Sequence, residues 1–313
     1  MHRSLRRLSV IAPSFAAALV LCISESAHAG KYDLDLTRLG TQDAAGNVVK
    51  DDAGFRSLSS ELGNVVSPKP MDPADSLGLS GFSISSDFGI NTVSGNSGYW
   101  RNTAQGGADN VLSTVQIMGR KGLWPGIEIG GGANHVFDSR MWAMIGYGKI
   151  AFHEGFHHLP IPSIALRGSF GRLLGAKDFN LTTAAPAIEI SHVFGLGKTF
   201  SLTPYVGYEA LIIVSRSQVL DATPNCDEFP DTYNETECPA TTTGTSEFVF
   251  KNAGAIVRHR PHLGLRMIFS VIRLGVEAMF VPPGSSDGEV DGESVADNSK
   301  FQTNITFSVG LDF

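Results

Sequence analysis

The clearest pattern in the chain is the alternation of apolar and polar residues over its last thirteen positions. From Phe301 to Phe313 every second residue is apolar or threonine, and the residues between them are polar or glycine. Side chains of a β-strand point alternately to two faces, so this period of two predicts a strand with one apolar face. Its length exceeds that of most globular strands and suits a tilted strand that crosses a bilayer.

The same alternation recurs upstream and predicts ten strands in all. Its phase changes between Phe269 and Leu274, which indicates a tight hairpin. An even number of strands suits antiparallel closure, so we expect an all-β fold, an antiparallel transmembrane β-barrel over residues 80–313. The predicted strands are 80–91, 110–120, 125–136, 140–152, 161–172, 182–194, 199–214, 254–269, 272–282 and 300–313.

The predicted connections alternate in length along the chain. Short turns on one rim and long polar loops on the other are typical of outer-membrane barrels. The expected short connections lie near 121–124, 153–160, 195–198 and 270–271. The expected longer ones lie near 92–109, 137–139, 173–181, 215–253 and 283–299, of which 137–139 is the shortest.

Residues 30–79, which precede the first predicted strand, show no such alternation. We expect one short amphipathic helix there, capped by Asp51 or Asp52 and ended by Gly63 and the prolines that follow. The segment lies across the barrel mouth, enters the lumen as a plug, or packs on the periplasmic rim; the sequence leaves these three placements open. The apolar face of the predicted helix carries Phe55, Leu58, Leu62 and Val65.

The chain opens with the features of a secretory signal peptide. Three arginines precede an apolar stretch from Leu8 to Ile23, and Ala27-His28-Ala29 fits a small-x-small cleavage site. We therefore expect residues 1–29 to be removed after Ala29. The apolar stretch is short for a membrane-spanning helix, which favours a cleaved signal over an anchor.

Charge and cysteine content narrow the possible partners. Removing residues 1–29 takes away three Arg and one Glu, which leaves 21 basic and 30 acidic residues and a net charge of −9. This acidic balance argues against nucleic-acid binding. Cys226 and Cys238 then remain, and in an exported protein their proximity predicts one disulfide that closes a short loop.

These features together resemble those of Gram-negative outer-membrane β-barrel proteins, specifically small porin-like barrels. The resemblance implies a place in the cell outer membrane and contact with its lipid and lipopolysaccharide. It also implies recognition of the C-terminal strand, which ends at Phe313, by the barrel-assembly machinery. A weaker similarity concerns fatty-acid-transporter-like barrels, which use an N-terminal segment as a hatch. Its one local match is "DPAD" at 72–75, with Asp72 where an asparagine is expected.

The predicted inward face of the strands carries many ionisable residues. Arg or Lys on the lipid face at mid-membrane costs about 2–4 kcal/mol, so these charges must face the interior. They either line a narrow path that selects ions or solutes, or form acid–base pairs that seal a small barrel. The expected lumen-lining charges are Asp87, Arg120, Glu128, Lys149, Arg167, Glu189, Glu209, Arg258, Arg260, His262, Arg266, Arg273 and Glu277.

One motif suggests metal chemistry, the HExxH sequence from His153 to His157. On a helix this spacing places two imidazoles on one face, with Glu154 as a general base. Gly155 inside the motif and the prolines soon after it disfavour a helix, so we expect a periplasmic turn. A metal site formed by His153, His157 and His158 is the alternative, and we expect no metal and no cofactor.

The sequence therefore predicts an integral outer-membrane barrel that acts as a porin-like channel or transporter for small solutes and is not an enzyme. The alternative is a structural or surface-interaction barrel that acts through its long extracellular loops. A third hypothesis is a barrel-embedded lipid hydrolase or metal-dependent hydrolase. It would draw on the strand histidines His135, His192 and His259, but no spacing selects a catalytic triad among them.

Overall fold

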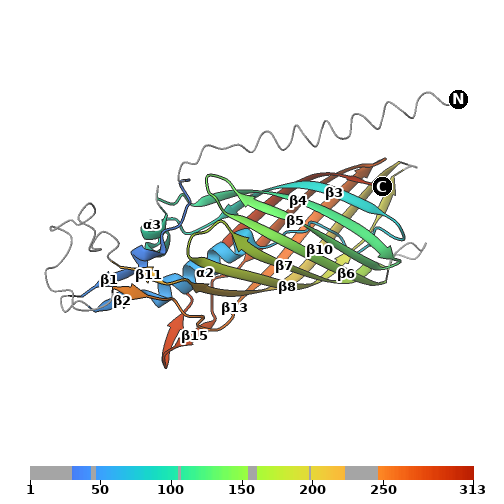
Figure 1. Cartoon of the computed structure of the whole chain (residues 1–313). Coiled ribbons are helices and arrows are strands. Elements are labelled where there is room, and N and C mark those ends of the chain that lie inside the picture. The colour runs from blue at the N-terminus through green and yellow to red at the C-terminus, as the bar shows by residue number, and fades with distance from the viewer. Residues whose placement is uncertain (1–29, 44–46, 105–106, 154–160, 197–198, 223–245) are drawn as a thin grey trace.

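The computed structural model describes residues 30–43, 47–104, 107–153, 161–196, 199–222 and 246–313. Ten antiparallel strands form a closed barrel, which confirms the predicted fold class (Figure 1). Nearly every predicted strand boundary lies within four residues of the observed one. The barrel strands are β3 (Phe82–Thr92), β4 (Val111–Trp124), β5 (Ile127–Val136), β6 (Trp142–His153), β7 (Ser163–Leu174), β8 (Phe179–Ser191), β10 (Phe200–Ser217), β13 (Ile256–Phe269), β14 (Ile272–Val281) and β17 (Gln302–Asp312).

The order of the strands around the barrel follows the chain. Each barrel strand pairs with the next, and β17 pairs with β3. The longest ladder joins β10 to β13, from Phe200 opposite Phe269 to Ile213 opposite Ile256. A short strand, β9 (Phe194–Leu196), adds to β10 at the rim. Ring closure pairs the main-chain groups that an open sheet would leave at its edges.

The barrel is apolar outside and polar inside, the reverse of a soluble protein. On β17, Phe307 and Val309 are 48% and 60% exposed, whereas Thr306 and Ser308, which alternate with them, are buried. An exposed apolar band of this kind is the surface that a bilayer covers. Aromatic side chains form the girdle expected at a membrane interface on the rim that holds the C-terminus: Phe82, Trp124, Phe152, Phe194, Phe269 and Phe313.

The two ends of the barrel differ as predicted. The short-turn end carries the β4–β5 and β13–β14 turns and the C-terminus, and the long-loop end carries the connections from β3 to β4, from β10 to β13 and from β14 to β17. The turn predicted at 121–124 belongs instead to β4, which continues to Trp124. Pro125 and Gly126 make the turn, and Gly126 has a φ of 78°, a value that glycine adopts without strain.

Helix α2 (Asp52–Val66) lies inside the barrel at the long-loop half (Figure 1). Asp51 caps it by accepting a 2.7 Å hydrogen bond from the Gly54 amide. The prediction that Gly63 ends the helix is wrong, because Gly63 is an interior position pressed against Ile213. Every residue from Gly54 to Asp75 is buried, so the helix and the extended segment after it run through the lumen. We call residues 52–75 the plug.

The chain enters the barrel at the long-loop end and leaves it at the short-turn end. Near its start the Tyr32 amide donates to the Asp138 carbonyl in the β5–β6 connection. Beyond the plug, the Leu77 amide donates to Glu128, and Phe82 then begins β3 beside Phe313. In the part of the chain that the structure describes, no helix is long and apolar enough to span a membrane.

Small elements cover the long-loop end, and we call them the cap. Leu36, Trp100, Phe248 and Phe250 pack in its core, together with the first turn of α2. Asp291 and Gly292, both at positive φ, form the tight turn of the hairpin that protrudes from it. The cap elements are η1 (Leu36–Leu39), β1 (Gly40–Gln42), β2 (Val48–Lys50), α3 (Gly98–Thr103), β11 (Leu220–Asp221), β12 (Glu247–Phe248), β15 (Asp287–Val290) and β16 (Glu293–Ala296).

Candidate functional site in the barrel lumen

The predicted lumen charges all lie on barrel strands and all are buried. The most exposed of the thirteen, Arg266, exposes 6% of its surface. These thirteen side chains point into the lumen because side chains alternate along each strand and the intervening residues face outward. Their involvement in the passage of a solute stays a prediction.

Part of this set forms a network within the barrel wall. The Arg167 guanidinium lies 2.9 Å from Glu189 and 3.1 Å from Glu209. Arg260 also pairs with Glu209, and His262 Nε2 lies 2.9 Å from Glu189. These contacts join β7, β8, β10 and β13. In a low-dielectric interior, the attraction between the paired charges offsets the free-energy cost of removing them from water.

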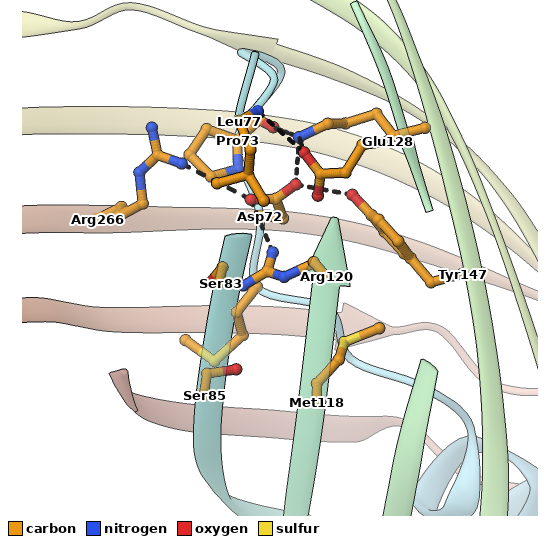
Figure 2. Close-up of polar contacts among 12 residues, drawn as sticks. Asp72, Pro73, Leu77, Ser83, Ser85, Met118, Arg120, Glu128, Tyr147 and Arg266 are labelled. Atoms are coloured by element: carbon orange, nitrogen blue, oxygen red, sulfur yellow. Dashed lines mark hydrogen bonds and ion pairs between the residues drawn. The ribbon is translucent and has the colours of Figure 1, made fainter. Parts of the chain in front are cut away.

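Three further members of the set bind the plug at Asp72. One Asp72 oxygen lies 2.7 Å from the Arg120 guanidinium, and the Tyr147 hydroxyl donates a 2.7 Å hydrogen bond to the other. Lys149 pairs with Asp72 and Arg266 approaches it at 3.7 Å. Figure 2 shows Arg120, Tyr147 and Arg266 converging on Asp72 from different strands. A single plug carboxylate therefore lies among three cations and a phenol of the wall.

Further contacts fix the plug on either side of Asp72. Asp75 pairs with Arg266 and accepts a 3.0 Å hydrogen bond from Ser191. Arg273 donates to the Met71 carbonyl. The main-chain carbonyls of Pro73 and Asp75 accept from the Lys149 ammonium at 3.1 and 2.8 Å. The wall thus binds the plug backbone as well as its side chains.

Lys69 closes the end of α2. Its ammonium donates to the carbonyls of Asn64 and Val65 at 3.0 and 2.9 Å, where the helix leaves them without partners. The Lys69 main chain exchanges two hydrogen bonds with the Gln116 amide of β4. The negative end of the helix dipole favours the ammonium at this position.

In the long-loop half, Glu61 joins α2 to the cap. It accepts hydrogen bonds from the indole N–H of Trp100 at 2.7 Å and from the Tyr99 hydroxyl at 2.9 Å. It also accepts from the amides of Ser94 and Lys300. Burial and the nearby Glu61 charge raise the pKa of Tyr99, so this phenol stays a donor.

Ser60 ties the same helix to the segment before β17. Its hydroxyl lies 3.0 Å from that of Ser299 and donates to Asp297 at 2.7 Å. Arg258 donates to both serine hydroxyls, at 2.7 and 2.8 Å. Arg258, a predicted lumen charge, has hydroxyl and carbonyl partners here instead of a carboxylate.

The buried charges of the lumen and its mouth balance. Nine cations face nine carboxylates, of which the plug supplies Arg56, Lys69, Glu61, Asp72 and Asp75. The buried residues of the plug therefore carry a net charge of −1, and the buried residues around it carry a net charge of +1. Sequence reasoning placed none of these five residues among the lumen charges, although it named Asp72 in the weaker similarity. One signal was available: the predicted wall set holds seven Arg or Lys but only five carboxylates, so buried carboxylates were required elsewhere.

The remaining predicted sites fall largely outside the described residues. Glu154, His157 and His158 lie there, as do Cys226, Cys238 and residues 1–29. His153 is the last residue of β6, so the motif begins on a strand. Within the described ranges, no group of three or more metal-binding side chains occurs.

The lipid-facing wall carries two further features. Gly148, Gly168, Pro186 and Ala210 are among the residues that line an apolar groove of about 640 Å³. Tyr208 lies at its rim, with its hydroxyl hydrogen-bonded to His259 Nδ1 on the neighbouring strand. His135, on β5, stacks on Trp142. The prediction that His192 lies on a strand is wrong, because this residue connects β8 to β9, and its ring meets Phe194 edge-on.

Comparisons with known proteins add resemblance at the level of the barrel. No family model and no curated protein matches the chain. Similar solved structures include the outer-membrane protease OmpT of Escherichia coli, with 9% identity, a TM-score of 0.31 and coverage of 75% of this chain and 94% of that one. Neisserial surface protein A has 9% identity and a TM-score of 0.28, with coverage of 74% of this chain and 97% of that one. Ail of Yersinia pestis, in complex with a heparin analogue, has 9% identity and a TM-score of 0.25, with coverage of 75% of this chain and 99% of that one.

A Pseudomonas aeruginosa FadL homologue is also similar, with 9% identity, a TM-score of 0.17 and coverage of 82% of this chain and 97% of that one. These structures are of outer-membrane proteins. The assignment of the fold itself rests on the closed ten-strand ring and its apolar exterior.

Proposed function

We propose that this chain is a channel for small solutes in the outer membrane of a Gram-negative bacterium, closed by its own plug. In this proposal residues 1–29 are a signal peptide that export removes. The assembly machinery inserts the barrel by way of the strand that ends at Phe313. The long-loop end faces outward and the apolar band meets lipid and lipopolysaccharide.

One observation carries the proposal: the plug occupies the lumen but belongs to no ladder of the barrel. Its withdrawal breaks side-chain and capping contacts and leaves every strand pair intact. An α-helix with its side chains is about 10–12 Å wide. A lumen that holds α2 therefore has that width when α2 is absent, which is enough for a small hydrated solute.

The polar character of the lumen supports the same proposal. The wall at the level of the plug is lined by ionisable and hydroxyl side chains, which water solvates readily once the plug leaves. An apolar core would seal a barrel at lower desolvation cost, because each buried ion carries a penalty of several kcal/mol. A wall that can be hydrated is what an opening channel requires.

A disulfide staple between α2 and the segment before β17 tests the proposal. Ser60→Cys and Ser299→Cys place two thiols where the hydroxyls now lie 3.0 Å apart, within reach of disulfide geometry. The background carries Cys226→Ser and Cys238→Ser. In planar bilayers we expect the oxidised protein to show no conductance steps and the reduced protein to show them.

Two controls accompany this measurement. The single Ser60→Cys variant must conduct equally with and without reductant, and a heat-dependent shift on a gel must show that each variant is folded. Equal steps from the oxidised and reduced forms would mean that ions pass while the plug stays in place. Absence of steps from the reduced form and from the natural chain would contradict a channel.

A surface-interaction role is the second candidate, and the organised cap favours it. The β15–β16 hairpin presents Asp287, Glu289 and Glu293 beside the Lys251–Asp291 ion pair of 2.7 Å. Changing the first three to amides separates the two roles. A channel keeps its conductance in this variant, whereas a surface-interaction barrel loses attachment of cells to a charged surface and still folds.

The proposal contains no catalytic step and no cofactor. A hydrolase that uses the HExxH motif or the Tyr208–His259 pair is the third candidate. The HExxH form predicts turnover of a lipid or peptide ester that is lost on chelation or on Glu154→Gln, and the form that uses the pair predicts turnover that is lost on His259→Ala. Ester hydrolysis by the purified barrel that survives dialysis and disappears in the corresponding variant would replace the channel proposal.

A further inference from the structure

The wall residues around Asp72 have the composition of an anion-binding site. Arg120 comes from β4, Lys149 from β6 and Arg266 from β13, and we call these three residues the cationic cluster. The Arg120 and Lys149 side chains are 0% exposed and the Arg266 side chain 7%. Tyr147 adds a hydroxyl donor directed at the same carboxylate. These groups belong to the barrel, whereas the carboxylate that they bind belongs to the plug.

The plug supplies most of the negative charge that the cationic cluster contacts. Among the described residues, Asp72 is the one carboxylate within 4.0 Å of the Arg120 guanidinium. Arg266 pairs only with Asp72 and Asp75 in the same range of the chain. Lys149 alone has a wall partner, Glu128, at 3.3 Å. With the plug withdrawn, three cations and one carboxylate remain, a local charge of +2.

We propose that the cationic cluster and Tyr147 form the binding site for the carboxylate of a small organic anion, and that Asp72 occupies this site when the channel is closed. This inference rests on the proposed channel function and names its substrate class. The Asp72 side chain ends in the same group as such a solute. Its contacts, two guanidinium groups, an ammonium and a phenol, show how the wall would hold that group (Figure 2).

Competition between the two carboxylates couples binding to opening. An entering anion that takes Arg120 and Lys149 removes the main charged contacts of Asp72, so it favours the state in which the plug is displaced. Cations meet a site of net positive charge and are disfavoured, because rings of Arg or Lys select anions in pores. A neutral solute of the same size has no charge with which to displace Asp72.

The test uses the natural full-length chain in planar bilayers, with succinate as the probe. We expect succinate to raise the opening frequency about tenfold and saturably, and uncharged erythritol to leave it unchanged. Inorganic phosphate in a separate arm shows whether the site needs a carboxylate or accepts any oxyanion. A potassium chloride gradient across the membrane is expected to give a reversal potential that indicates chloride preference.

Paired variants assign the response to the site. Arg120→Gln together with Lys149→Gln should abolish the succinate response. Arg172→Gln is the matched control, because that arginine lies on the outer wall, where Thr182 and Asn180 accept its hydrogen bonds. It should respond as the natural chain does. A gel shift on heating shows that each variant is folded, and the solute and selectivity arms need no variant.

The outcomes separate the two proposals. A channel that conducts but prefers potassium, or that opens equally often with and without succinate, overturns the anion site and leaves the channel function standing. A phosphate response equal to that of succinate overturns the carboxylate preference. A chain that never conducts, with its staple reduced or absent, contradicts the proposed function and the anion site together.

Discussion

The two halves of the plug are held by different forces. In the long-loop half, α2 buries Phe55, Leu58 and Leu62 against the cap and the upper wall, and the Phe55 and Phe250 rings stack with centroids 4.5 Å apart. In the short-turn half, residues 67–75 have no helix and contribute no residue to the hydrophobic cluster that α2 joins, and Asp72 and Asp75 hold them through ion pairs. Apolar packing, together with the hydrogen bonds of Ser60 and Glu61, anchors one half, and ion pairs anchor the other.

The difference indicates where opening starts. Apolar contacts lose free energy in proportion to the area exposed and offer a small solute nothing specific to replace. Ion pairs can be exchanged for pairs with another ion. The short-turn half is therefore the half that a charged solute loosens first, before α2 leaves the lumen.

Asp72→Asn tests the charged half and should have the largest effect. The amide keeps the shape of the side chain but leaves Arg120 without a carboxylate partner. Removal of one member of a buried ion pair costs about 3–5 kcal/mol. We expect amide hydrogen exchange to accelerate at least about a hundredfold over residues 67–75, since each 1.4 kcal/mol is about tenfold, and to change little in α2.

Asp87→Asn is the matched control for that experiment. Asp87 is also a buried lumen carboxylate, but it belongs to the wall and accepts from Ser308 and Gln116. Its substitution removes the same charge without touching the ion pairs of the plug. Equal acceleration in both variants, or equal acceleration in α2 and in residues 67–75, would show that the two halves open as one unit.

Leu62→Ala tests the apolar half and should have the next largest effect. Leu62 is fully buried, and truncation of a buried leucine costs about 2–5 kcal/mol. We expect exchange to accelerate over α2 while residues 67–75, held by Arg120 and Lys149, change less. Mass spectrometry of peptides from the two segments measures both rates in one sample. The opposite order of rates would place the anchor of the plug in its charged half.

The barrel was predictable from the sequence because each strand carries its own signal. Alternation along β17 assigns Phe307 to the lipid and Ser308 to the lumen without knowledge of any other strand. The plug has no comparable signal. Residues 67–75 have no period, and their partners on β4, β6 and β13 come from distant parts of the chain. Their position depends on tertiary contacts that local patterns do not encode.

Helix α2 also shows that local sequence patterns do not predict tertiary contacts. Its capping residue Asp51 and its apolar face were predictable, but the partners of its polar face were not. Arg56, Ser60 and Glu61 are buried against partners from the cap and the loops. Amphipathic spacing shows which residues a helix buries against an apolar surface, not whether a polar surface covers the rest.

Gly63→Ala tests how closely α2 fits the wall, and its effect should be the smallest. A Cβ at this position would lie 2.6–2.9 Å from the Ile213 side chain. Overpacking of this kind costs about 1–3 kcal/mol, while alanine gains about 1 kcal/mol over glycine within a helix. We expect a net loss of about 1 kcal/mol in the free energy of unfolding, measured with urea in detergent micelles.

The same change in an Ile213→Ala background should have the opposite sign. Without the isoleucine side chain the added methyl group has room, so the helix preference for alanine remains and the double variant should be about 1 kcal/mol more stable than Ile213→Ala alone. A loss of stability in both backgrounds would mean that backbone, not Ile213, limits the space at residue 63. That result would assign the tight contact of α2 to the main chain of the barrel wall and not to the Ile213 side chain.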